Sequence, residues 1–146
     1  MQACRALSVL VLCLWSVGCT GEPKAEVFKT VSAGGTLTFK GKPLPGFLVS
    51  FQPTESSRTA TGVTDSEGKF VLGTNAPGDG AVAGQHSVAV VWQPPVDDGM
   101  GDVIDDPAKL PKPPVNLPVN YASVKTSGIR VEIPEEGNTE IAVELE

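Results

Sequence analysis

Short segments in which apolar and polar residues alternate recur from about residue 36 to the end of the chain. In residues 141–145, for example, the large apolar side chains Ile141, Val143 and Leu145 alternate with Ala142 and Glu144. This period of two places alternate side chains on opposite faces of a β-strand, whereas no segment beyond residue 19 keeps helical spacing for three turns. We therefore expect seven strands, at residues 36–39, 47–51, 59–64, 70–72, 88–92, 129–133 and 141–145.

Turns rich in glycine and proline separate these segments. Residues 41–46 read Gly-Lys-Pro-Leu-Pro-Gly, residues 65–68 read Asp-Ser-Glu-Gly, and residues 134–138 are expected to close a hairpin between the last two strands. Strands with one apolar face must bury that face against another element. The pattern predicts an all-β fold, a seven-stranded, Ig-like β-sandwich with two facing sheets.

The N-terminus has the layout of an export signal. One base, Arg5, precedes about a dozen mostly apolar residues, a run too short to span a bilayer. The run ends in Ser16-Val17-Gly18-Cys19, which resembles the lipobox of bacterial lipoproteins, although Ser16 replaces the usual Leu. The resemblance implies that residues 1–18 are cleaved and that Cys19 receives acyl chains. An ordinary secretory signal, or an apolar start with a chance cysteine, remains the alternative.

This interpretation sets the expected organisation of the chain. Residues 1–18 form a cleaved signal peptide, residues 19–32 a lipidated cysteine with a polar tether, and residues 33–146 the domain. Cys4 and Cys13 would leave with the signal, so no disulfide could form. Three acyl chains would hold the protein firmly on a membrane. Thr20, rather than Asp, follows the cysteine, which by the rule of that family implies the outer membrane, facing either the periplasm or the surface.

Composition narrows the possible partners. The chain has 17 acids and 11 bases, a net charge of −6, and loss of Arg5 with the signal would leave 10 bases and a charge of −7. Nucleic-acid binding needs a basic surface, so we exclude it as a partner. The 16 glycines and 13 prolines suit short strands with tight turns.

Residues 93–120 interrupt the strand pattern with seven prolines. A connection of this length in a small domain is typically a functional or loosely ordered loop. We expect it to leave the sheet after Trp92 and to return near Tyr121, and these aromatic residues could form a platform for a sugar or peptide. The loop also carries five aspartates between residues 97 and 106. Carboxylates suit Ca²⁺, but the spacing of these five does not match an EF-hand, so no metal site is assigned. The candidate binding loop comprises Trp92, Asp97, Asp98, Asp102, Asp105, Asp106 and Tyr121.

Catalytic chemistry finds little support in the residues. His86 is the only histidine and is in phase with Val88 and Val90, so we expect it to pack near the core rather than to bind metal or act as a base. A serine nucleophile would need that base. Asp65 and Asp79 stand in turns, where their side chains should cap backbone amides. We expect no catalytic residue, no cofactor and no enzymatic activity.

Several motifs together resemble the carboxypeptidase regulatory-like domain. They are Gly-Lys-Pro-Leu-Pro-Gly at 41–46, Thr-Asp-Ser-Glu-Gly-Lys-Phe at 64–70 and Gly-Gln-His-Ser-Val at 84–88. The resemblance covers residues 33–92 and 120–146. It implies a seven-stranded, transthyretin-like sandwich that is common in small bacterial lipoproteins and that brings no catalytic residue. Phe47 and His86 depart from the family pattern, where a small and an aromatic residue are usual.

The sequence thus predicts a lipid-anchored protein of the bacterial cell envelope, a non-catalytic structural or partner-binding module. Its partners would be the membrane, through the anchor, and an unknown envelope protein or glycan. A carbohydrate- or Ca²⁺-binding module using residues 92–121 is the alternative. A transthyretin-like hydrolase, such as hydroxyisourate hydrolase, fits less well, because those enzymes use several histidines and end in Tyr-Arg-Gly-Ser, whereas this chain ends in Val-Glu-Leu-Glu.

Overall fold

The computed structural model describes residues 27–55, 58–94 and 112–146, which form an all-β body. Each of the seven expected segments overlaps a strand. The strands are β1 (Ala33–Phe39), β2 (Lys42–Pro43), β3 (Phe47–Pro53), β4 (Ala60–Val63), β5 (Lys69–Val71), β6 (Gly84–Trp92), β7 (Arg130–Ile133) and β8 (Asn138–Leu145).

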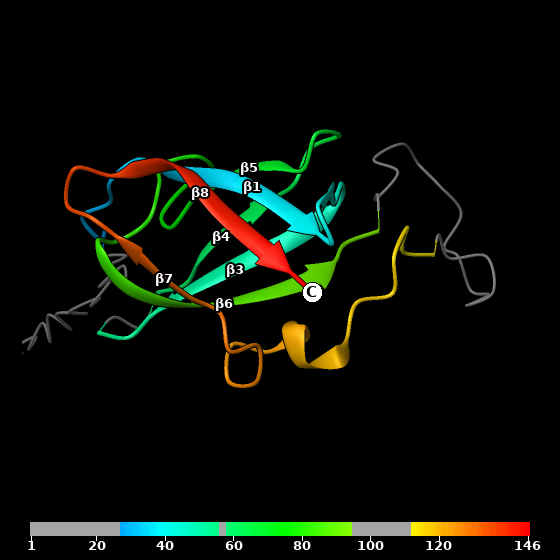
Figure 1. Cartoon of the computed structure of the whole chain (residues 1–146). Helices are drawn as coiled ribbons and strands as arrows, with labels where there is room; N and C mark the ends of the chain where they lie inside the picture. The colour runs from blue at the N-terminus through cyan, green and yellow to red at the C-terminus, as the bar shows by residue number, and fades with distance from the viewer. Residues whose placement is uncertain (1–26, 56–57, 95–111) are drawn as a thin grey trace, which may run out of the picture.

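The strands form two sheets of four strands each (Figure 1). In the first sheet, β1 pairs with β8 on one side and with β2 and β5 on the other. The second sheet has the order β4-β3-β6-β7, and all of its pairs are antiparallel. The pair of β1 with β8 is parallel, with Gly35 opposite Ile141 and Phe39 opposite Leu145.

The hydrophobic core lies between the two sheets. Leu37 and Val143 of the first sheet belong to the same buried cluster as Val49, Phe51 and Val88 of the second. Phe51 and Phe70, from opposite sheets, place their ring centroids 5.8 Å apart. The alternation in the sequence therefore identifies the buried faces correctly.

A short strand occupies part of the predicted turn at residues 41–46. Thr38 pairs with Pro43 and Phe39 with Lys42, so the described residues hold eight strands rather than seven. The reversal needs only Lys40 and Gly41, which both have positive φ, 50° and 76°. Two consecutive residues of this kind match the twist of a two-residue hairpin, so the chain turns back at once.

The predicted hairpin between the last two strands is wrong. Residues 134–138 do turn, but β7 pairs with β6 in the second sheet and β8 pairs with β1 in the first. Gly137 packs tightly against the Ser32 carbonyl, and the N–H of Asn138 donates to that oxygen over 2.9 Å. This contact places the start of β8 beside β1. The alternation alone does not determine the choice of sheet, since a strand with one apolar face fits the edge of either sheet.

The two lateral sides of the body differ. On one side, Thr61 of β4 exchanges two backbone hydrogen bonds, of 2.9 and 2.8 Å, with Gly73, which lies just beyond β5. These bonds join the two sheets. On the other side, β7 and β8 are the edge strands of their sheets. They are connected by the 134–137 turn, with no ladder between them among the residues described.

One short 3-10 helix, η2 (Val119–Ala122), precedes β7. We find no helix in the described ranges that is long and apolar enough to cross a membrane.

Candidate functional site

His86, the only histidine, lies in β6 and is completely buried. Its Nδ1 is 2.9 Å from the Gly84 carbonyl oxygen, and its ring centroid is 6.1 Å from that of Phe51. Since a carbonyl only accepts, Nδ1 carries the proton and donates it, which leaves Nε2 without a hydrogen-bond partner among the described residues. Burial lowers the pKa of His86, and the bond to Gly84 opposes that change more weakly. His86 is therefore a neutral core residue, as its position in the strand pattern predicts.

The other two buried polar residues also serve the backbone. The Thr64 hydroxyl accepts the N–H of Phe47 over 2.9 Å, where the chain enters β3. The Ser127 hydroxyl donates to the Val88 carbonyl and ties the segment before β7 to β6. Sequence reasoning assigned no bonding role to these two residues, because their partners, Phe47 and Val88, lie 17 and 39 positions away in the chain.

Two aspartates predicted to cap turns do so. Asp65 Oδ1 accepts the N–H groups of Glu67 and Lys69 over 2.8 and 2.9 Å. Asp79 accepts the N–H of Thr74 over 2.6 Å and that of Asn75 over 3.1 Å. These bonds, chiefly that from Thr74, hold the pKa of Asp79 below its usual value, because they favour the carboxylate form.

The ordered turn at Asp79 positions a clamp that sequence reasoning missed. The Asn75 side chain accepts the N–H of Phe28 and donates to its carbonyl, both over 2.9 Å. Val31 then exchanges backbone bonds of 2.8 and 3.0 Å with Ala81. The part of the predicted tether that the structure describes, from Val27 onward, is thus attached to the body. The available signal was the Asn75-Ala-Pro-Gly-Asp79 sequence, but the clamped segment is far away in the chain.

The candidate binding loop is described only at its two ends. Trp92, the last residue of β6, is half-buried and lines a hollow of about 180 Å³ with Phe47, Val115 and Leu117. Tyr121, in η2, is half-buried as well, and its hydroxyl is 3.4 Å from the backbone O and N of Glu146. Both rings pack against the core cluster.

The remaining predicted site residues lie outside the described residues: Cys19, Asp97, Asp98, Asp102, Asp105 and Asp106. Within the part of the chain that is described, no group of three or more His, Cys, Asp or Glu side chains gathers as a metal site would require.

A hollow lies on the outer face of the first sheet. It has a volume of about 660 Å³ and extends over β1 between β5 and β8. The sheet is hollowed here because small residues lie at its centre, Gly34 in β1 and Ala142 in β8. The exposed side chains of Val71, Lys69 and Glu140 surround them. The hollow adjoins the edge strand β8.

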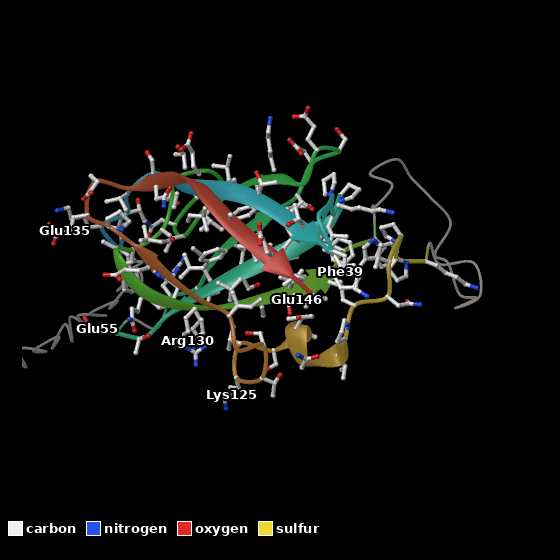
Figure 2. The ribbon with its side chains drawn as sticks, in the orientation of Figure 1. Phe39, Glu55, Lys125, Arg130, Glu135 and Glu146 are labelled. Atoms are coloured by element: carbon white, nitrogen blue, oxygen red, sulfur yellow. The ribbon has the colours of Figure 1, made fainter. Side chains whose placement is uncertain are left out.

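The sequence around β8 is acidic. Residues 131–146 contain six glutamates and no Lys or Arg. Figure 2 shows Glu135 at the turn that precedes β8 and Glu146 just beyond its end, while Arg130 and Lys125 point away from β8 on the lower side of the view. Glu140 and Glu144, within β8, are exposed.

Comparison with known proteins adds no assignment, since no family model, curated protein or solved structure matches this chain.

Proposed function

We propose that the chain is a lipid-anchored protein of the bacterial cell envelope whose β body is a non-catalytic structural or partner-binding module. The anchor is Cys19, after cleavage of residues 1–18. The observation that carries the proposal is the short distance along the chain from Cys19 to Phe28, whose N–H and C=O are both held by Asn75. Nine residues span at most about 30 Å, so an anchor at Cys19 keeps the body next to the bilayer.

The polar groups of the core support a non-catalytic role. His86, Thr64 and Ser127 each form a hydrogen bond with a backbone group. A general base or nucleophile needs a polar side chain that can reach a substrate. All three residues are at least nine-tenths buried, and their bonds stabilise the contacts between strands.

We also propose that the two sheets form a transthyretin-like sandwich of the carboxypeptidase regulatory-like kind. In the motifs that carry this resemblance, Gly46 and Gly68 both have φ of 74°, a backbone conformation that favours glycine. Leu44 of the first motif and Phe70 of the second are buried in the core between the sheets. The glycines and the buried side chains of these motifs thus have structural roles, which supports the resemblance.

Metabolic labelling with a lipid precursor tests the anchor. The wild-type chain, expressed with its N-terminus intact, should incorporate the label and sediment with membranes. Cys19→Ala should lose the label and leave the membrane fraction. Cys13→Ala is the matched control, because this cysteine lies within the apolar run and should not be modified. Label retained in Cys19→Ala, or no label in the wild type, would contradict the proposal.

A further inference from the structure

The outer edge of β8 offers backbone groups for pairing. β8 is an edge strand of eight residues that pairs only with β1 among the described strands. The carbonyl of Leu145 accepts the N–H of Lys40 over 3.0 Å, and the carbonyl of Ile141 faces Gly35 of β1. Main-chain groups alternate along a strand, so those of Glu140, Ala142 and Glu144 point away from β1.

Only one of these outward groups is satisfied within the described residues. The N–H of Glu140 donates to Asn138 Oδ1 over 2.9 Å. The N–H and C=O of Ala142 and Glu144 take no part in the ladder with β1. An edge of this kind is a template for an additional strand.

The side chains along this edge select what could pair there. Glu140, Ala142 and Glu144 are exposed on the outer face of the sheet, whereas Ile141 and Val143 point into the core. Residues directly opposite in neighbouring strands interact strongly, and opposite charges are favourable. An incoming strand would therefore place basic residues opposite the two glutamates.

The hollow beside β8 favours a particular kind of side chain opposite Ala142, the middle one of the three outward-facing residues. Ala142 is small, and behind it lies the 660 Å³ hollow above Gly34 and Thr36. A long side chain opposite Ala142 would extend over it into this space, since neighbouring strands are only about 4.8 Å apart. We propose that β8 binds an extended basic segment of a partner protein, with Lys or Arg at positions i and i+4 and a bulky side chain at i+2.

A second copy of this chain is a poor occupant of the same edge. If two β8 strands paired antiparallel about Ala142, Glu140 of one copy would lie opposite Glu144 of the other. Like charges directly opposite each other destabilise a pair of strands. The glutamates thus oppose self-pairing and favour a basic partner.

Peptide binding to the purified full-length chain tests this proposal. The probe is a blocked peptide, Thr-Thr-Arg-Thr-Tyr-Thr-Arg-Thr-Thr, whose binding is followed by fluorescence anisotropy. We expect binding to weaken about tenfold when both arginines are replaced by glutamate. The peptide is expected to pair antiparallel to β8 with its tyrosine opposite Ala142, so the tyrosine N–H faces β8. N-methylation of the tyrosine should therefore abolish binding, whereas N-methylation of the two adjacent threonines should not.

Matched protein variants locate the contact. Glu140→Gln with Glu144→Gln should weaken binding about tenfold, and Glu135→Gln with Glu136→Gln, which removes the same charge from the turn, less than twofold. In the complex, the amide protons of Ala142 and Glu144 should exchange more slowly. No binding, equal losses in the two double variants, an N-methylated tyrosine peptide that still binds, or a chain that self-associates through β8 would each overturn the proposal.

This inference rests on the proposed partner-binding role, but the two fail separately. Peptide binding is measured without a membrane, so its failure leaves the lipid-labelling result intact. Loss of the anchor in Cys19→Ala, in turn, should leave peptide binding unchanged.

Discussion

On one lateral side of the body the two sheets are joined by hydrogen bonds, whereas on the other side two edge strands remain apart. The joined side depends on glycine. Gly62 in β4 packs so closely against the Val71 carbonyl that a Cβ would collide with it, and Gly73 has the same relation to the loop that follows it. On the open side, exposed glutamates project from β8. The difference teaches that one side is built for tight backbone contact and the other remains available for an additional strand.

The largest effect should come from adding side-chain volume to the joined side. Gly62→Val would push β4 away from Val71 and the bridge at Gly73, at a cost of about 2–3 kcal/mol in the free energy of unfolding. Ala142→Val, the same kind of increase on the outer face of the open side, should change it by less than about 0.5 kcal/mol. Urea unfolding monitored by Trp92 fluorescence measures both. Equal losses would show that the two sides do not differ in packing.

Acid should act in the core, at the strand β6 that adjoins the open side. His86 pairs with Val131 of β7, and its pKa is lower in the folded chain than the ordinary value of about 6.5, because burial disfavours the charged ring. The unfolded chain therefore binds the proton more readily. The stability that the neutral ring contributes is complete above about pH 6.5 and is lost as the pH falls through the lower folded pKa.

Urea unfolding at about pH 7.5 and about pH 5.5 measures this dependence. His86→Phe retains an aromatic ring in the core but cannot titrate, so its stability should fall less over this interval than that of the wild type. If the two chains lost stability equally, His86 would not be the group responsible.

A smaller loss in the free energy of unfolding is expected when the contact between Asn75 and the N-terminal segment is removed. Asn75→Ala removes two hydrogen bonds to Phe28 and should cost about 1 kcal/mol. The chain before β1 should then be cut by chymotrypsin at Phe28 more rapidly than in the wild type. Asn116→Ala, at an exposed position, is the control and should change neither property. Unchanged cleavage in Asn75→Ala would mean that the clamp does not restrain this segment.

Local alternation was sufficient to predict which face of each strand is buried, but it was insufficient to predict which strands pair. Phe47, Val49 and Phe51 are buried as the pattern requires, since a period of two is a property of the strand itself. The pairing of β8 with β1 is set by contacts of residues far apart in the chain, such as Asn138 with Ser32. A hairpin between the last two strands was expected from their alternation and from the turn at residues 134–138, and it was wrong because neither feature determines which sheet a strand joins.

The candidate site could be predicted to a similar degree. The turn-capping roles of Asp65 and Asp79 follow from short-range chemistry, and the structure confirms both. The core position of His86 followed from its phase with Val88 and Val90. Asn75 and the edge of β8 were missed, because one acts on a distant segment and the other becomes an edge only through the topology of the sheet.

The parallel pair of β1 and β8 has a consequence for the order of folding. These are the first and last strands of the described body, and Gly35 lies opposite Ile141. The central strand of the first sheet therefore acquires its long partner only after the ribosome has produced the final strand. Contacts between such distant residues close late and make folding slow. In a chain of this design, completion of the first sheet is therefore expected to be a late step of folding.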